Sequence, residues 1–153
     1  METQNKELTI TRLFDAPIDL VWAAWTDEEH IKNWWGPKGF TNPVCNWNAT
    51  AGNKILIHMK APDGVTYPMD GEFKEIKLHE KIVFSSGALD KNGKRLFDIQ
   101  NTIDFVEEGD KTKLILHFTM SNITAEGAPY LKGQEMGWNM SLDKLVVLLN
   151  TLK

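Results

Sequence analysis

Residues 96–120 read LFDIQNTIDFVEEGDKTKLILHFTM, and this stretch decides the fold class. Apolar and polar side chains alternate through residues 96–106 and again through residues 112–120, which is the period-two pattern of a strand with one buried face. The Glu-Gly-Asp segment at 108–110 leaves room for a tight turn but not for a crossover helix, so the two strands pair antiparallel. The sequence therefore predicts an antiparallel sheet with one apolar face.

The same kind of pattern continues toward the N-terminus. Strands are expected over residues 55–60, 65–76 and 81–86. They follow the turn Ala51-Gly52-Asn53 and are separated by the turn Pro62-Asp63-Gly64 and the short link Leu78-His79-Glu80. Residues 7–14 supply a first strand, and residues 44–47 are a candidate for one more. Together these segments predict a meander of about six antiparallel strands.

Segments whose apolar residues have helical spacing lie near both ends of the chain, outside most of the predicted strands. Apolar residues recur every three to four positions in residues 18–25 and 31–35, which predicts two short helices after the first strand. Thr26 and Glu29 have the spacing of a capping box at the start of the second helix. Residues 131–149 repeat the apolar spacing over the longest stretch and predict a terminal helix that covers the sheet. The layout is α+β.

Composition limits the class of protein. The chain has 153 residues, 42% of them hydrophobic and 25% charged, which fits one globular domain. A net charge of −4 argues against nucleic-acid binding, and no apolar run is long enough for insertion into a membrane. Cys45 is the single cysteine, so no internal disulfide forms. Residues 1–7 lack the features of a signal peptide, so a cytoplasmic location is expected.

Tryptophan is unusually common, with six residues, five of which fall within residues 22–47. One interpretation is an aromatic core around the first helices, since Trp is highly buried on average. The other is that some of these rings line a cavity for an apolar ligand. Both stay open at this point, as does the question whether Trp34 and Trp35 form core or a movable lid.

Strand parity separates the side chains that face inward from those that face solvent. In residues 97–105 the apolar set carries Asn101 inward, whereas His58 and His117 fall on the outer face of their strands. Catalysis by acids, bases or nucleophiles needs such a group inside the site, and nearly every Asp, Glu and His of the sheet lies outside. We therefore expect no catalytic residue, no metal site and no cofactor. Asn101 is expected either to bond the backbone or a buried water, or to orient the polar end of a ligand.

Six short motifs follow one another along residues 8–150. They are Arg12-Leu13-Phe14-Asp15-Ala16-Pro17, Val21-Trp22-x-x-Trp25-Thr26-Asp27, Trp34-Trp35-Gly36-Pro37, Gly71-Glu72-Phe73-Lys74-Glu75-Ile76, Lys81-Ile82-Val83-Phe84-Ser85, and Gly137-Trp138 followed by Leu142-x-x-Leu145. In this order they resemble the homologues of the activator of the heat-shock-protein-90 ATPase, a family of the START/birch-pollen-allergen-like (SRPBCC) superfamily. The resemblance implies a single START-like helix-grip domain over residues 1–153. In that fold a curved antiparallel sheet wraps around a long C-terminal helix, and two short helices close one end.

The resemblance also implies a hydrophobic cavity between the sheet and the terminal helix. We expect it to bind a small apolar or aromatic ligand without catalysis. The expected ligand-binding residues are Trp34, Trp35, Phe40, Ile57, Met59, Met69, Phe73, Phe84, Phe97, Ile99, Asn101, Met120, Gln134 and Trp138. A cavity filled by these side chains, with no ligand, is the competing interpretation.

Other functions remain open beside ligand binding. The family name points to a regulator of a chaperone ATPase, with a chaperone as partner and a role in the stress response. A polyketide-cyclase-like enzyme is a further alternative, against which the lack of inward acids and bases weighs. A monomer or a weak homodimer is expected.

Overall fold

The computed structural model describes residues 6–152, apart from the side chain of Lys132. Its elements are β1 (Lys6–Phe14), α1 (Ile18–Thr26), α2 (Glu28–Trp34), β2 (Thr41–Asn46), β3 (Lys54–Lys60), β4 (Thr66–Lys77), β5 (Lys81–Leu89), β6 (Arg95–Glu108), β7 (Lys111–Ser121), the 3-10 helix η1 (Ala128–Gly133) and α3 (Gln134–Leu152). Residues 1–5, which make up most of the N-terminal segment considered for a signal peptide, lie outside the described residues. Among the helices that the structure describes, none is long and apolar enough to cross a membrane.

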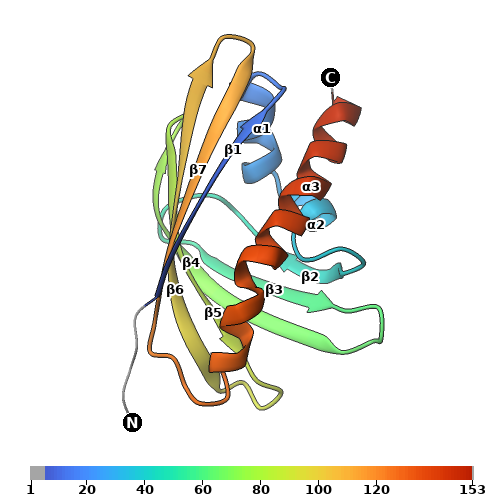
Figure 1. Ribbon diagram of the computed structural model, residues 1–153, viewed down its shortest axis with the longest axis vertical. Helices are drawn as coiled ribbons and strands as arrows, with labels where there is room; N and C mark the ends of the chain where they lie inside the picture. The colour runs from blue at the N-terminus through green and yellow to red at the C-terminus, as the bar shows by residue number, and fades with distance from the viewer. Residues whose placement is uncertain (1–5, 153) are drawn as a thin grey trace.

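The strands form one antiparallel sheet in the order β1-β7-β6-β5-β4-β3-β2. The sheet curves around α3, which runs along its concave side, while α1 and α2 lie at one end (Figure 1). This is the predicted α+β helix-grip fold. The sheet has seven strands because the candidate at residues 44–47 is a strand, which begins at Thr41 and pairs with β3.

The strands alternate between buried and more exposed residues as parity predicts. On β7 every second residue is buried, and the same holds for most of the inner face of β6. Asn101 is 1% exposed, whereas His117 lies on the other face, beside Glu7 of β1. The inner face of the sheet thus forms one wall of the interior.

The boundary between α1 and α2 differs from the predicted capping box. Thr26 is the last residue of α1, and its hydroxyl donates to the carbonyl of Trp22 at 2.8 Å. Asp27 caps α2 instead, because its extended backbone lets the carboxylate accept from the N–H of Glu29 at 2.9 Å. The second helix therefore starts one residue later than the sequence pattern predicts.

The terminal helix covers the concave side of the sheet with one narrow face. Leu142, Leu145 and Leu149 are buried against the sheet and the short helices. Val146, the residue after Leu145, is 38% exposed and lies at the margin of this face. The predicted start near residue 131 falls in η1, so the α-helix itself begins at Gln134.

Candidate functional site: a cavity between the sheet and the terminal helix

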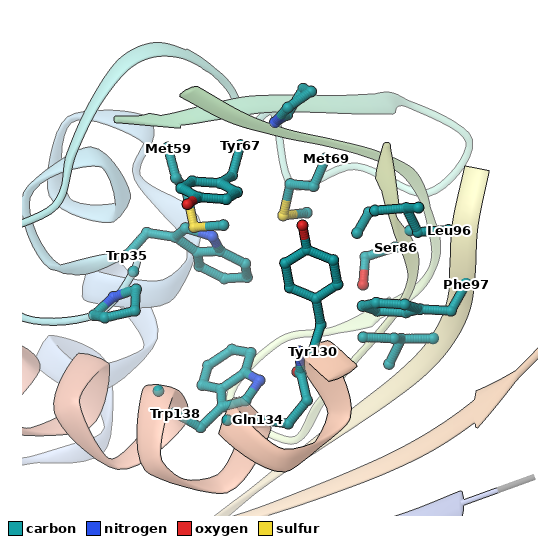
Figure 2. Close-up of a pocket in the computed structure, with 18 of the residues that line it drawn as sticks. Trp35, Met59, Tyr67, Met69, Ser86, Leu96, Phe97, Tyr130, Gln134 and Trp138 are labelled. Atoms are coloured by element: carbon teal, nitrogen blue, oxygen red, sulfur yellow. The ribbon is translucent and has the colours of Figure 1, made fainter. Parts of the chain in front are cut away.

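A cavity of about 440 Å³ lies between the inner face of the sheet and the first turns of α3. Strands β3 to β6 form its roof and one side, the segment after α2 closes the other side, and η1 and α3 form its floor (Figure 2). Ligand pockets in proteins commonly have a volume of roughly 300–1,000 Å³. No Asp, Glu, His, Lys or Arg lies among the described lining residues.

The cavity brings together most of the residues that the sequence predicted for a ligand site. Those along its wall are Trp35, Phe40, Met59, Met69, Phe97, Ile99, Asn101, Gln134 and Trp138. They come from the segment after α2, from β3, β4 and β6, and from α3. Residues distant in sequence thus share one surface.

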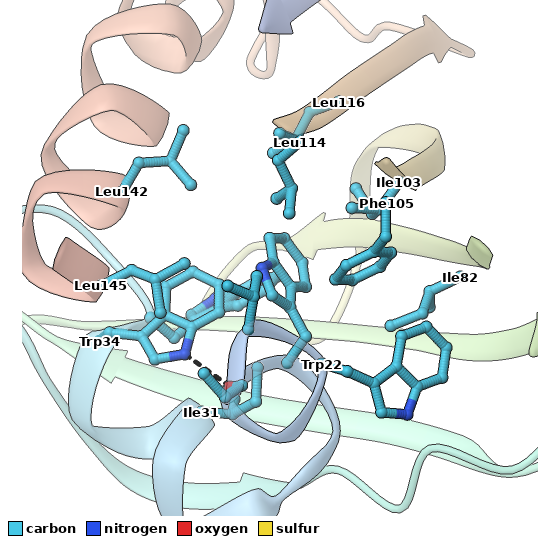
Figure 3. Packing of buried hydrophobic residues seen from close by; sticks show 14 of the residues in the cluster. Trp22, Ile31, Trp34, Ile82, Ile103, Phe105, Leu114, Leu116, Leu142 and Leu145 are labelled. Atoms are coloured by element: carbon cyan, nitrogen blue, oxygen red, sulfur yellow. Dashed lines mark hydrogen bonds between the residues drawn. The ribbon is translucent and has the colours of Figure 1, made fainter. Parts of the chain in front are cut away.

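The remaining five predicted residues lie in the packed core rather than on the cavity wall. These are Trp34, Ile57, Phe73, Phe84 and Met120, all buried. The indole N–H of Trp34 donates to the carbonyl of Ala24 at 2.8 Å, which fixes this ring against α1 (Figure 3). Strand parity selects the inner face correctly, but the ring of Trp47 fills the part of that face where Phe73 and Phe84 lie, with centroids 4.9 and 5.2 Å from theirs.

The cavity wall also contains residues that the sequence analysis did not select. Tyr67 and Ser86 share the inner parity of Met69 and Phe84, so the alternation of β4 and β5 could have identified them. Tyr130 could not be found in this way, because it projects from the 3-10 helix η1, which has no strand-like alternation. Figure 2 shows its ring standing within the cavity.

Two tryptophan rings form a rigid corner of the cavity. Trp35 and Trp138 meet nearly at right angles, with ring centroids 5.2 Å apart and an interplanar angle of 79°. Trp138 also stacks on Phe118 at 4.9 Å, and Trp35 packs against Trp47 at 5.2 Å. Because both rings pack against the core, this packing sets their orientation toward the cavity.

Asn101 and Ser86 give this apolar cavity a polar pair. The Asn101 amide Nδ2 donates to the carbonyl of Phe84 and to Ser86 Oγ, both at 3.0 Å. These two acceptors fix which way the amide points. Among the described residues no donor reaches Asn101 Oδ1, and Ser86 Oγ makes no bond as a donor, so one acceptor and one hydroxyl hydrogen remain available.

Lys144 of α3 anchors the segment that follows α2. Its Nζ lies 3.3–3.5 Å from the carbonyl oxygens of Trp35, Gly36, Pro37 and Phe40. Burial lowers the pKa of this ammonium group. The contact holds the Trp35 side of the cavity against the helix without placing a charge on the cavity wall.

The half-buried thiol of Cys45 lies on β2, outside the cavity. Burial, and then the nearby carboxylate of Glu28, raise the pKa of this thiol to about 11. No group of three or more His, Cys, Asp or Glu side chains that could hold a metal ion occurs within residues 6–152. Among the described residues, the cavity wall therefore presents no strong acid or base.

The fold and the cavity define a helix-grip protein of the SRPBCC type. Residues 15–150 match the model of the family described as Activator of Hsp90 ATPase homolog 1-like protein, and the chain belongs to that family. A comparison with curated proteins gives no match.

Solved structures with the same fold come from several bacteria. The AHSA1 protein from Silicibacter pomeroyi is 23% identical, with 97% of this chain and 100% of that chain covered and a TM-score of 0.82. A protein from Arthrobacter aurescens is also 23% identical, with 95% and 86% covered and a TM-score of 0.81. A protein from Nitrosomonas europaea is 22% identical, with 96% of each chain covered and a TM-score of 0.78. At these identities the similarity establishes the fold.

Proposed function

We propose that this chain is a non-catalytic, cytoplasmic binding protein that holds a small apolar or aromatic molecule in the cavity between the sheet and α3. The observation that carries the proposal is a cavity of about 440 Å³ whose described lining is mostly aromatic, aliphatic and sulfur-containing, with a few neutral polar side chains and no Asp, Glu, His, Lys or Arg. Such surroundings favour transfer of an apolar surface out of water, at roughly 25 cal/mol per Å² buried.

Preorganisation of the wall supports this function. Trp35 and Trp138 are packed in the core on one side and border the cavity on the other. Binding therefore does not have to order these large side chains, and the entropy cost of complex formation is correspondingly lower.

Native mass spectrometry of the protein purified gently from its own host tests the proposal, with a denatured sample as control. We expect an additional mass that disappears on denaturation. The neutral dye Nile red provides a second measurement, since its fluorescence should rise when it enters the cavity.

A matched pair of variants on β6 links binding to the cavity. Ile99→Phe adds volume to a side chain on the cavity wall and is expected to abolish the dye signal. Gln100→Phe adds a ring at the next residue, which is exposed on the opposite face, and should leave dye binding unchanged. If both variants and the wild type bind dye equally, or if no molecule binds the wild type, the proposal is wrong.

The family description supports a second candidate, a regulator of a chaperone ATPase. The test is the ATPase rate of a purified chaperone of the Hsp90 type, with and without this protein. A rate increase that Ile99→Phe leaves intact would place this activity on a surface separate from the cavity. An unchanged rate would remove this candidate.

A further inference from the structure

We infer that the ligand of the cavity is an uncharged aromatic molecule bearing a hydroxyl group, which is seated on the pair formed by Asn101 and Ser86. The inference rests on the proposed function, because it specifies what the same cavity selects.

The lining excludes a charged ligand. No ionised side chain of the described residues reaches the wall, so a carboxylate or ammonium group on the ligand would lose its water without gaining a partner charge. Lys144 is close in sequence to the α3 residues of the wall, but its ammonium group contacts backbone carbonyls of the segment after α2. An uncharged ligand avoids this desolvation cost.

The corner formed by Trp35 and Trp138 favours an aromatic ring. With the two indoles at 79°, a flat ring that stacks on one presents its face or edge favourably to the other. Phe97 and Tyr130, which contact each other with ring centroids 6.4 Å apart, supply further aromatic surface across the cavity (Figure 2). A flat aromatic molecule can contact both groups of rings.

The polar pair selects a hydroxyl group. Asn101 is 1% exposed, and its amide Nδ2 donates both hydrogens to the Phe84 carbonyl and to Ser86 Oγ. Its Oδ1 is left as an acceptor. Ser86 accepts from Asn101 and keeps its own hydrogen to donate. A hydroxyl group on the ligand can donate its hydrogen to Asn101 Oδ1 and accept the hydrogen of the Ser86 hydroxyl. An ether could use Ser86 alone, and a hydrocarbon would leave both groups unpaired.

Five naphthalene probes, measured by isothermal titration calorimetry at pH 7, test this selection. They are 2-naphthol, 2-methoxynaphthalene, naphthalene, 2-naphthoate and 2-naphthylmethylammonium. We expect 2-naphthol to bind about tenfold more tightly than naphthalene, as one to two net hydrogen bonds imply. The ether should fall between them, and the two ions should bind at least about a hundredfold more weakly than 2-naphthol.

Two adjacent serines of β5 provide the variant and its control. Ser86→Ala removes the donor on the cavity wall and should weaken 2-naphthol and the ether by roughly threefold to tenfold, with naphthalene unchanged. Ser85→Ala removes the same group from the opposite face, where it makes a long hydrogen bond to the carbonyl of Glu72 at 3.5 Å. The control should bind all probes as the wild type does.

The outcomes separate the inference from the proposed function. If naphthalene binds as tightly as 2-naphthol, if either ion matches 2-naphthol, or if Ser86→Ala behaves like Ser85→Ala, the inference is wrong while the binding function stands. If none of the five probes binds and native mass spectrometry finds no ligand, both are wrong.

Discussion

Cys45 is half-buried on β2, close to the acidic first turn of α2. Burial and Glu28 raise its pKa from the ordinary 9.0 to about 11, so its reactive thiolate is scarce at moderate pH. At pH 8 we expect iodoacetamide to modify the folded protein more slowly than the unfolded chain, by a factor on the order of a hundred, because the raised pKa leaves less thiolate. Mass spectrometry of timed samples, with and without denaturant, measures both rates.

The raised pKa of Cys45 also makes the free energy of unfolding depend on pH. The folded protein holds the thiol proton more tightly than the unfolded chain does, so the contribution of Cys45 to the free energy of unfolding falls as the pH rises from about 9 to about 11. Cys45→Ala should remove this part of the pH dependence. Equal alkylation rates for the folded and unfolded protein would show that the thiol is not shielded.

Two adjacent tryptophans show what the sequence could and could not predict for single residues. Helical spacing placed both Trp34 and Trp35 on an apolar face, and both are buried. Their roles differ because Trp34 ends α2 facing α1, where Ala24 accepts its indole N–H, whereas the chain turns extended at Trp35 and directs that ring to the cavity. This difference depends on how α1 and α2 pack, which one-dimensional spacing does not contain.

At the level of elements, the start of α3 offers a test of helix stability. A side chain added at Gly137 would meet Pro37 Cγ at 3.7 Å, an ordinary contact. Gly137→Ala should therefore raise the free energy of unfolding by about 0.5–1 kcal/mol, because alanine restricts the unfolded chain and favours the helix. Urea denaturation measures the change.

Gly71 of β4 provides the contrasting substitution. A Cβ there would lie 1.9 Å from the carbonyl oxygen of Ser85, so the two paired strands would have to shift. Gly71→Ala should lower the free energy of unfolding by about 1–3 kcal/mol. A loss of stability in Gly137→Ala would mean that the first turns of α3 are not helical as described.

The element boundaries show a second limit of sequence reasoning. Strand alternation and the short links predicted β1 and β3 to β7 well, since each of these strands has one apolar face, whereas only part of β2 was predicted. The region before α3 was harder, because Leu131 continues the helical spacing although it belongs to a 3-10 helix. That short helix supplies Tyr130 to the cavity, so part of the site was outside the reach of periodicity.

In the whole molecule, the interior has a packed region and a hollow one. Trp25, Trp34 and Trp47 are fully buried beside α1 and α2, whereas the cavity lies toward η1. Alternation along β3, β4, β6 and β7 predicts which of their residues face inward, and it does so correctly. Which part of that face stays unfilled depends on the curvature of the sheet and the path of α3, and these follow from the complete fold.

The packed region and the cavity can be compared directly through Ile57 and Met59, which lie two residues apart on the inner face of β3. Ile57 is fully buried in the core, while Met59 is half-buried and borders the cavity. Ile57→Ala should lower the free energy of unfolding by about 2–5 kcal/mol and leave Nile red affinity unchanged. Met59→Ala should cost about 1 kcal/mol or less, because part of its side chain already faces empty space, and should change the affinity. Urea denaturation and dye titration measure both effects. Equal losses of stability, with neither variant altering dye binding, would mean that side chains fill this space in solution as tightly as they fill the core.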